Sequence, residues 1–315
     1  MSVRGPLHEK SRVDAWGGRE KAAGLQMATR ITVSIPTVRP KTLRCAIDSI
    51  RRQSYTDWEL IVVGQGPDDE LRRVTEECAA LDARIRYLHL NQLGISHARN
   101  AAVAEAQGEI LAFTDDDCEA DPGWLSEIAQ CFDEDSQLGL VGGSLLAPNV
   151  HQHLLAVCPE IRPSEVTYDP VRDGHKAPPG FDFTGANFAM RRSVALRVGP
   201  FDECMGVGAI FASAEDLDYK LRVESADIRM RSTPKLVVRH THGCRIGFKA
   251  VFRHRRSYAV GQGALAAKMT MRGDPRGRQW LGFCSVACDG DSYSQGDFPC
   301  LNGCSYPKHM PLQSF

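Results

Sequence analysis

Three consecutive aspartates follow Ile110–Phe113, a short apolar run whose β-branched and aromatic residues predict a buried strand. Asp115, Asp116 and Asp117 therefore lie at the carboxyl end of that strand. Carboxylates this close repel one another, and burial strengthens the repulsion. Mg²⁺ relieves such repulsion and is typically held by one or two carboxylates together with the phosphates of a substrate. The triplet predicts a metal–diphosphate site, and the alternative is a solvated turn with spare acids.

A second acidic pair, Glu215-Asp216, stands at the start of a helical pattern. Leu217 and Leu221 lie four residues apart, on one face of that helix. Acidic side chains at a helix start interact favourably with the helix dipole, so the pair could simply stabilise the helix end. The spacing alone leaves open whether the pair has a chemical role as well.

Alternating strands and helices are expected to position these acids. Short β-branched runs predict four strands, at Ile31–Ile35, Leu60–Val63, Ile85–Leu88 and Ile110–Phe113. Helical patterns separate them, which predicts right-handed crossovers and a mostly parallel sheet. Ligands bind beyond the carboxyl ends of such strands. The polar loops at 36–39, 64–69 and 115–117 are therefore expected to meet at one rim.

Composition places few further limits on the 315-residue chain. Apolar residues make up 43% and the net charge is −1, which fits a globular protein and gives no electrostatic case for a nucleic-acid partner. No apolar run approaches the roughly 18 residues of a membrane span. Residues 1–30 are polar and lack the core of a secretory signal. We expect a disordered extension there, with Met27 as an alternative start.

Five motifs occur in a fixed order along the chain. They are Pro-Thr at 36–37, Gly-Ile-Ser-His-Ala-Arg-Asn at 94–100, Phe-Thr-Asp-Asp-Asp-Cys at 113–118, Thr-Gly-Ala-Asn at 184–187 and Ala-Glu-Asp at 214–216. In this order they resemble family 2 glycosyltransferases, which are inverting enzymes of the GT-A fold, over about residues 31–272. The resemblance implies an α/β protein of GT-A type, with a Rossmann-like, mostly parallel central sheet flanked by helices. It also implies a nucleotide-binding half at 31–140 and a smaller acceptor-side half at 141–240.

The resemblance also implies roles for the acidic residues. Asp117 would be a direct ligand of Mg²⁺ or Mn²⁺, with Asp115 beside it and with His240 or His242 completing the metal site. Asp115 and Asp116 would also contact the ribose or the waters of the metal. Asp216, next to Glu215, would be the catalytic base that deprotonates the acceptor hydroxyl.

Further residues match the family's nucleotide and sugar sites. The residues expected to surround the nucleotide are Pro36, Thr37, Arg39, Gln65, Arg99 and Asn100. Gly185 and Asn187 match the stretch that lines the sugar pocket. The family usually has an acid after the second strand, where this chain has Gly64-Gln65-Gly66. Gln65 could read a base through its amide, so the donor nucleotide stays open.

The C-terminal part of the chain is rich in basic residues and then in cysteines. Residues 239–278 hold ten Lys or Arg against one acid, Asp274, with aromatic residues interleaved. This predicts a basic amphipathic helical segment at 241–278, which either contacts an anionic membrane or acceptor or forms a solvated face. Residues 279–315 form a divergent tail with cysteines at 284, 288, 300 and 304. Their C-x3-C spacing departs from the usual C-x2-C of zinc sites, so a zinc site and a loose tail are both open.

The combined interpretation is a metal-dependent inverting glycosyltransferase. It would move a sugar from a nucleoside-diphosphate sugar to a hydroxyl of a saccharide or lipid-linked acceptor, as in cell-envelope or polysaccharide synthesis. Seven of the 11 cysteines are scattered through the body of the chain, which favours a reducing cytoplasm, with the inner face of the plasma membrane as a peripheral location. A sugar-phosphate nucleotidyltransferase and a non-catalytic nucleotide-sugar-binding protein are the alternatives.

Overall fold

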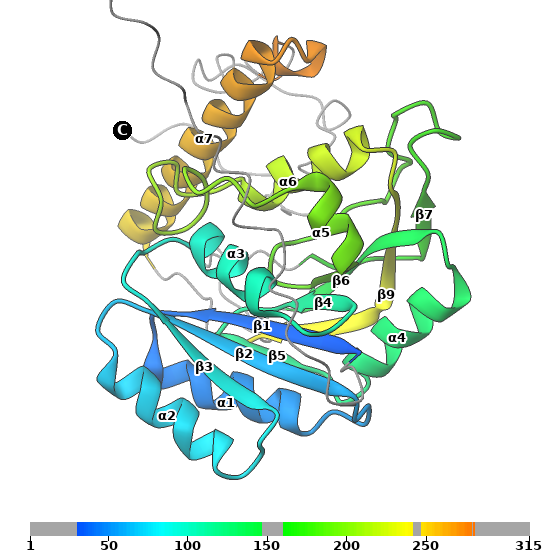
Figure 1. The fold of residues 1–315 in the computed structure, drawn as a ribbon. Helices are drawn as coiled ribbons and strands as arrows, with labels where there is room; N and C mark the ends of the chain where they lie inside the picture. The colour runs from blue at the N-terminus through cyan, green and yellow to red at the C-terminus, as the bar shows by residue number, and fades with distance from the viewer. Residues whose placement is uncertain (1–29, 147–159, 242–246, 279, 281–315) are drawn as a thin grey trace, which may run out of the picture.

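The computed structural model describes residues 30–146, 160–241, 247–278 and 280 (Figure 1). Apart from Arg30 and Trp280, the N-terminal extension and the cysteine-containing tail that the sequence predicts lie outside the described residues, and so does His242, the alternative to His240.

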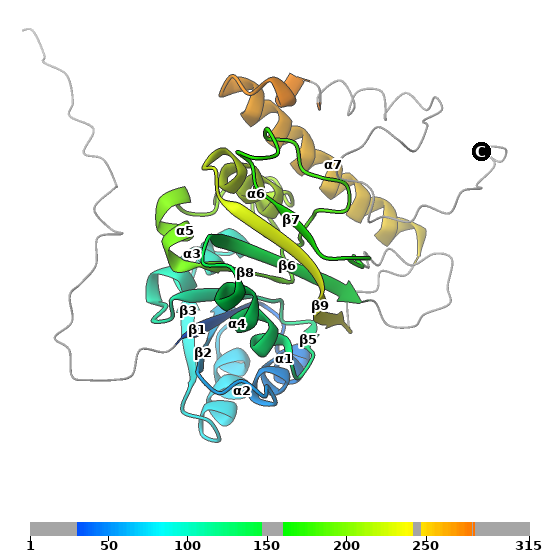
Figure 2. The same ribbon diagram turned by 90° about the vertical axis from the view of Figure 1, so that its right-hand side faces the viewer.

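The described residues form one nine-stranded sheet in the order β3-β2-β1-β4-β8-β6-β9-β5, with β7 paired to β9. Its strands are β1 (Ile31–Thr37), β2 (Trp58–Gln65), β3 (Ile85–Leu90), β4 (Ile110–Phe113), β5 (Cys118–Ala120), β6 (Leu138–Leu146), β7 (Val166–Tyr168), β8 (Phe188–Arg191) and β9 (Arg229–His240). From β3 to β4 all pairings are parallel. Antiparallel pairings enter at β8, and β6 and β9 lie side by side in parallel (Figure 2). The predicted α/β fold with its mostly parallel sheet is confirmed.

Helices cover both faces of this sheet. They are α1 (Pro40–Arg51), α2 (Asp69–Ala79), α3 (Ile95–Glu105), α4 (Trp124–Glu134), α5 (Arg192–Val198), α6 (Glu215–Ser225) and α7 (Phe248–Met271). Side chains along a strand point alternately to opposite faces. Leu60 and Val62 of β2 accordingly join the core under α1 and α2, whereas Ile61 and Val63 pack against α3. Figure 1 shows α1 and α2 below β1 to β3 and α3 above them.

Strand pairing sets the position of the acidic residues. Because β4 pairs in parallel with β1, the residues after Phe113 emerge beside the end of β1. β5 then runs antiparallel to the end of β9. The end of β9 therefore returns to the acidic triplet from a point more than 100 residues further along the chain.

The long helix α7 lies beside α6. Its C-terminal half packs against the segment that precedes α6. Leu265 and Met269 join Met205 and Ala214 in a separate apolar cluster. Among the described residues, no helix is both long enough and apolar enough to span a bilayer.

Candidate active site

The loop after β1 reaches the acidic triplet at the end of β4. Thr37, the last residue of β1, donates its hydroxyl to Asp116 Oδ2 at 2.7 Å. The Arg39 guanidinium contacts Asp116, and its Nη1 lies 2.8 Å from Asp117 Oδ2. Both carboxylates are buried, so the hydroxyl and the cation offset the repulsion between them. Pro36 lies within β1, one residue before this contact.

His240 reaches the triplet because β9 ends beside β5. Cys118 lies opposite His240 in the strand pairing, and His240 Nε2 lies 3.2 Å from Asp117 Oδ2. Burial disfavours the charged form of Asp117, but His240 and Arg39 outweigh it and lower the pKa of Asp117 to about 2. Burial also opposes the charge on His240, but its pairing with Asp117 is stronger, and the pKa of His240 is raised.

The donor atoms of this corner fit a divalent cation. Single ligand atoms of Asp117, Cys118 and His240 all lie within 4.8 Å of one another. Asp115 Oδ1 is buried without a hydrogen-bond partner, which leaves its lone pairs available to a cation. Burial raises the pKa of the Cys118 thiol well above its ordinary value. Cys118 belongs to the main apolar core, so Asp117, His240 and Asp115 are the better candidates to hold Mg²⁺ or Mn²⁺.

Asp216 begins the second half of the site. Its Oδ2 accepts a hydrogen bond from the Gly185 amide at 2.9 Å, and its Oδ1 accepts one from the Leu217 amide at 2.8 Å. The side chain remains partly exposed, and each oxygen keeps a second lone pair. Ala214, two residues earlier, has a φ of 70°. This left-handed conformation costs a non-glycine residue about 1–3 kcal/mol, and such strain clusters at functional sites.

Glu215 has a different environment from its neighbour. It is buried, and its Oε1 accepts a hydrogen bond from Arg99 Nη1 at 3.0 Å. Burial and the charge of Asp216 raise the pKa of Glu215 to about 7, although Arg99 opposes the shift. Glu215 is therefore an internal partner of Arg99, and Asp216 is the member of the pair that faces outward.

Arg99 connects the two acidic groups. It is only 1% exposed, and its Nη2 donates to the Gly185 carbonyl at 2.8 Å and lies 3.9 Å from Asp115 Oδ1. Burial raises the pKa of Asp115 to about 6, with the charges of Asp117 and Asp116 acting in the same direction and Arg99 opposing them. One guanidinium thus contacts the end of β4, the Gly185 peptide and the start of α6.

Three other predicted site residues turn inward. Gln65 Nε2 donates to the Gln92 and Gly94 carbonyls and so fixes the loop before α3. Asn100 exchanges two hydrogen bonds with the Phe201 backbone. Asn187 is fully buried, accepts from Trp124 Nε1 at 2.8 Å and donates to the Ser144 and Leu236 carbonyls. These amides hold the framework of the site, and the side chain of Asn187 does not reach its surface.

Two ion pairs near Asp216 were not predicted from the sequence. Arg162 Nη2 lies 2.5 Å from Glu160 Oε2, and Lys220 Nζ lies 2.6 Å from Asp182 Oδ1. Burial and the charges of Asp182 and Asp216 raise the pKa of Glu160 to about 8, against the effect of Arg162. No motif marks these residues, because the fold alone brings their separate segments together.

The fold and the two acidic centres define a GT-A glycosyltransferase, and the comparison with known families agrees. Residues 32–199, just over half of the chain, match the model of glycosyl transferase family 2. The chain belongs to this family and is a transferase. This decides against the nucleotidyltransferase and the non-catalytic binding protein that the sequence left open.

Two curated relatives illustrate the family. The glucosyl-dolichyl phosphate glucuronosyltransferase of Haloferax volcanii is 26% identical over 164 residues, which are 51% of each chain. The GalNAc(5)-diNAcBac-PP-undecaprenol beta-1,3-glucosyltransferase of Campylobacter jejuni is 35% identical over 105 residues, 32% of this chain and 34% of that protein. The chain therefore matches about half, or less, of the length of these relatives.

Solved structures show the same fold at low sequence identity. Residues 1–349 of S. aureus TarS superpose with a TM-score of 0.59 at 15% identity, over 80% of this chain and 69% of that one. The mannosyltransferase PcManGT from Pyrobaculum calidifontis, solved with GDP-Man and Mn²⁺, gives a TM-score of 0.55 at 18% identity, over 84% of this chain and 76% of that one.

Proposed function

We propose that this chain is a metal-dependent inverting glycosyltransferase that uses a nucleoside-diphosphate sugar. The observation that carries the proposal is the position of two acidic centres on either side of one buried guanidinium. The end of β4 offers carboxylates for a cation, and the start of α6 offers a carboxylate for a proton. The proposal assigns 31–140 to the donor side and 141–240 to the acceptor side.

The donor would bind at the end of β4. Asp117 and His240, with Asp115 beside them, would hold Mg²⁺ or Mn²⁺, which when bound stabilises negative charge on a departing diphosphate. Arg39 is half-exposed at the same rim and can pair with a phosphate, while Thr37 keeps Asp116 in place. The neighbour solved with GDP-Man and Mn²⁺, and TarS solved with UDP-GlcNAc, support a nucleotide sugar and a divalent cation here.

Asp216 is the proposed general base. The acceptor oxygen forms a bond to the anomeric carbon as the bond from that carbon to the diphosphate breaks, and Asp216 takes the hydroxyl proton. Attack from the face opposite the leaving group inverts the configuration. A positioned base of this kind typically contributes about 10²–10⁴-fold.

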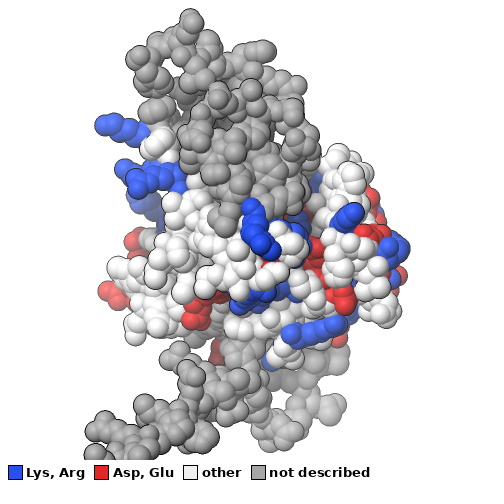
Figure 3. Space-filling view, turned by 90° about the horizontal axis from the view of Figure 1, so that it is seen from above, with Lys and Arg blue, Asp and Glu red and all other residues white. Residues whose placement is uncertain are grey.

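The acceptor is proposed to be a saccharide or a lipid-linked sugar. The names of the two curated relatives refer to dolichyl-phosphate and undecaprenol-linked substrates. The N-terminal half of α7 exposes Lys249, Arg253 and Arg256, and Phe252 is 61% exposed beside them. Lys and Arg side chains lie at several places on the face seen in Figure 3, including its upper left edge. This basic, partly aromatic surface suits peripheral contact with an anionic membrane.

A donor panel combined with Asp216→Asn tests the proposal. Purified protein is assayed with UDP-, dTDP- and GDP-sugars, with and without Mn²⁺, for nucleoside-diphosphate release and for the configuration of the product. Metal-dependent release and an inverted product are expected, and Asp216→Asn should lower kcat about 10²–10⁴-fold while still binding donor. A retained configuration, or a fully active Asp216→Asn, would contradict the mechanism.

A further inference from the structure

We propose that Arg99 is a positioning residue that orients the base Asp216 through the Gly185 peptide, and that it does not bind the nucleotide. This inference rests on the proposed function, in which Asp216 accepts the proton. It departs from the expectation that Arg99, at the start of α3, contacts the donor nucleotide.

The burial of Arg99 is the first reason. With 1% of its surface exposed, the side chain has almost no area to offer a ligand. Its guanidinium carbon lies 5.9 Å and 5.5 Å from the ring centres of Phe188 and Phe201. A charge enclosed in this way must be neutralised from within the protein. The carboxyl groups nearest to it are those of Glu215 at 3.0 Å and Asp115 at 3.9 Å.

The Gly185 peptide connects Arg99 to the base. Its carbonyl accepts from Arg99 Nη2 at 2.8 Å, while its N–H donates to Asp216 Oδ2 at 2.9 Å. A Cβ atom at this position would lie 2.9 Å from Arg99 Nη2 and 3.1 Å from Asp216 Oδ2. Glycine therefore permits both contacts at once, and a larger residue would force the two side chains apart.

Glu215 provides a second connection between the same two residues. Arg99 Nη1 binds the Glu215 side chain, and Asp216 is the next residue of α6. The guanidinium fork thus holds α6 through one nitrogen and the Gly185 loop through the other. Lysine retains the positive charge but lacks this planar pair of donors. We therefore expect Arg99→Lys to keep the charge balance of the site and to lose one of the two contacts.

A role in positioning predicts a specific kinetic pattern. Displacing a catalytic group by about 1 Å can lower the rate about 10²-fold. Arg99→Lys and Gly185→Ala should therefore each lower kcat by about that factor, with little change in donor affinity. Because both act on Asp216, neither should lower kcat much further when combined with Asp216→Asn. A residue that only supports the fold would give additive effects.

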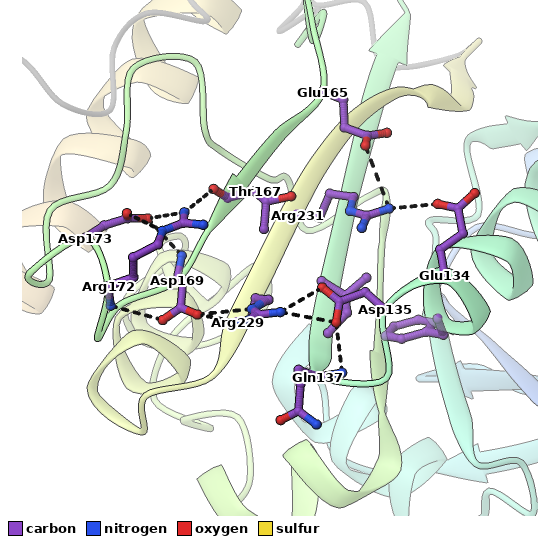
Figure 4. Close-up of polar contacts among 12 residues, drawn as sticks. Glu134, Asp135, Gln137, Glu165, Thr167, Asp169, Arg172, Asp173, Arg229 and Arg231 are labelled. Carbon is purple, nitrogen blue, oxygen red and sulfur yellow. Dashed lines mark hydrogen bonds and ion pairs between the residues drawn. The ribbon is translucent and has the colours of Figure 1, made fainter.

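Arg231 provides the matched control. It is also a buried arginine, 8% exposed, and it pairs with Glu134 at 3.1 Å and Glu165 at 3.8 Å. Figure 4 shows the two ion pairs of Arg231 beside the Asp135–Arg229–Asp169 ion pairs. In the described part of the chain, the ion pairs of the acidic triplet are made by Arg39, Arg99 and His240, and not by these arginines. Arg231→Gln should lower stability and leave kcat unchanged.

The experiment measures kcat, donor KM and donor affinity by calorimetry for these variants, with thermal unfolding of each. The proposal is overturned if Arg99→Lys weakens donor binding at unchanged kcat, which would mark a nucleotide contact, or if its effect on kcat adds fully to that of Asp216→Asn. If Arg99→Lys does not fold, Gly185→Ala decides alone, because it retains both charges. Absence of transfer in the wild-type protein with every donor would instead count against the proposed function.

Discussion

Two adjacent carboxylates at the start of α6 acquire different properties from their surroundings. Asp216 is partly exposed and held by two backbone amides, whereas Glu215 is enclosed and paired with Arg99. A similar division appears at the end of β4, where Asp117 is paired with Arg39 and His240, and Asp115 Oδ1 has no hydrogen-bond partner. Neighbouring carboxyl groups that have different environments, and therefore different chemical roles, are typical of acid–base sites.

The buried carboxyl of Glu215 predicts a particular pH dependence of stability. Its pKa is raised from 4.5 to about 7 in the folded protein, so the folded state binds its proton more tightly than the unfolded state. This contribution to the free energy of unfolding is complete below about pH 4.5 and is lost as the pH rises towards about 7. In urea denaturation across this pH range, the free energy of unfolding should decline as the pH rises, and Glu215→Gln should make that decline smaller. Identical profiles for the two proteins would contradict the assignment.

At the scale of elements, α7 is attached to the segment that leads into the proposed base. Gly261 of α7 packs against Ser213, which precedes Ala214 and Glu215. Ser213 also donates its hydroxyl to the Tyr258 carbonyl at 3.3 Å. A long helix is thus coupled to the start of α6 through one close approach of backbones, which only glycine permits.

Two glycines of α7 provide a matched pair of substitutions. A Cβ at Gly261 would lie 2.1 Å from Ser213 Oγ, whereas a Cβ at Gly263 would meet nothing within 4 Å. Gly261→Ala should cost about 1–3 kcal/mol through overpacking and lower kcat by shifting the start of α6. Gly263→Ala should stabilise the helix by about 0.5–1 kcal/mol. Equal effects in urea denaturation would show that α7 is not docked in this way.

At the scale of the whole molecule, sequence periodicity predicted the four parallel strands and the rim where their loops meet. It did not predict β9, whose Arg, Lys and Pro residues hide the alternation of buried positions. The family resemblance, and not the periodicity, implied that Arg99, Gln65 and Asn187 face a ligand. Their partners lie at sequence separations of up to 116 residues, and no local pattern records such contacts.

The surface of α7 makes a prediction about membranes. Lys249→Glu, Arg253→Glu and Arg256→Glu combined should weaken binding to vesicles that contain anionic lipid by more than about 100-fold, because each basic residue contributes about 1 kcal/mol. Sedimentation with anionic and neutral vesicles measures this. Reversal of Arg52 and Arg73, which are 61% and 62% exposed outside α7, is the control. Equal losses in both sets would rule out a specific surface.

The most direct test of the central claim is calorimetry of UDP, dTDP and GDP binding with and without Mn²⁺. At least one nucleotide should bind markedly more tightly with the metal, and Asp117→Asn should abolish that gain while leaving metal-free binding unchanged. If Mn²⁺ changes the affinity of no nucleotide for the wild-type protein, the end of β4 is not a metal–diphosphate site and the account is wrong.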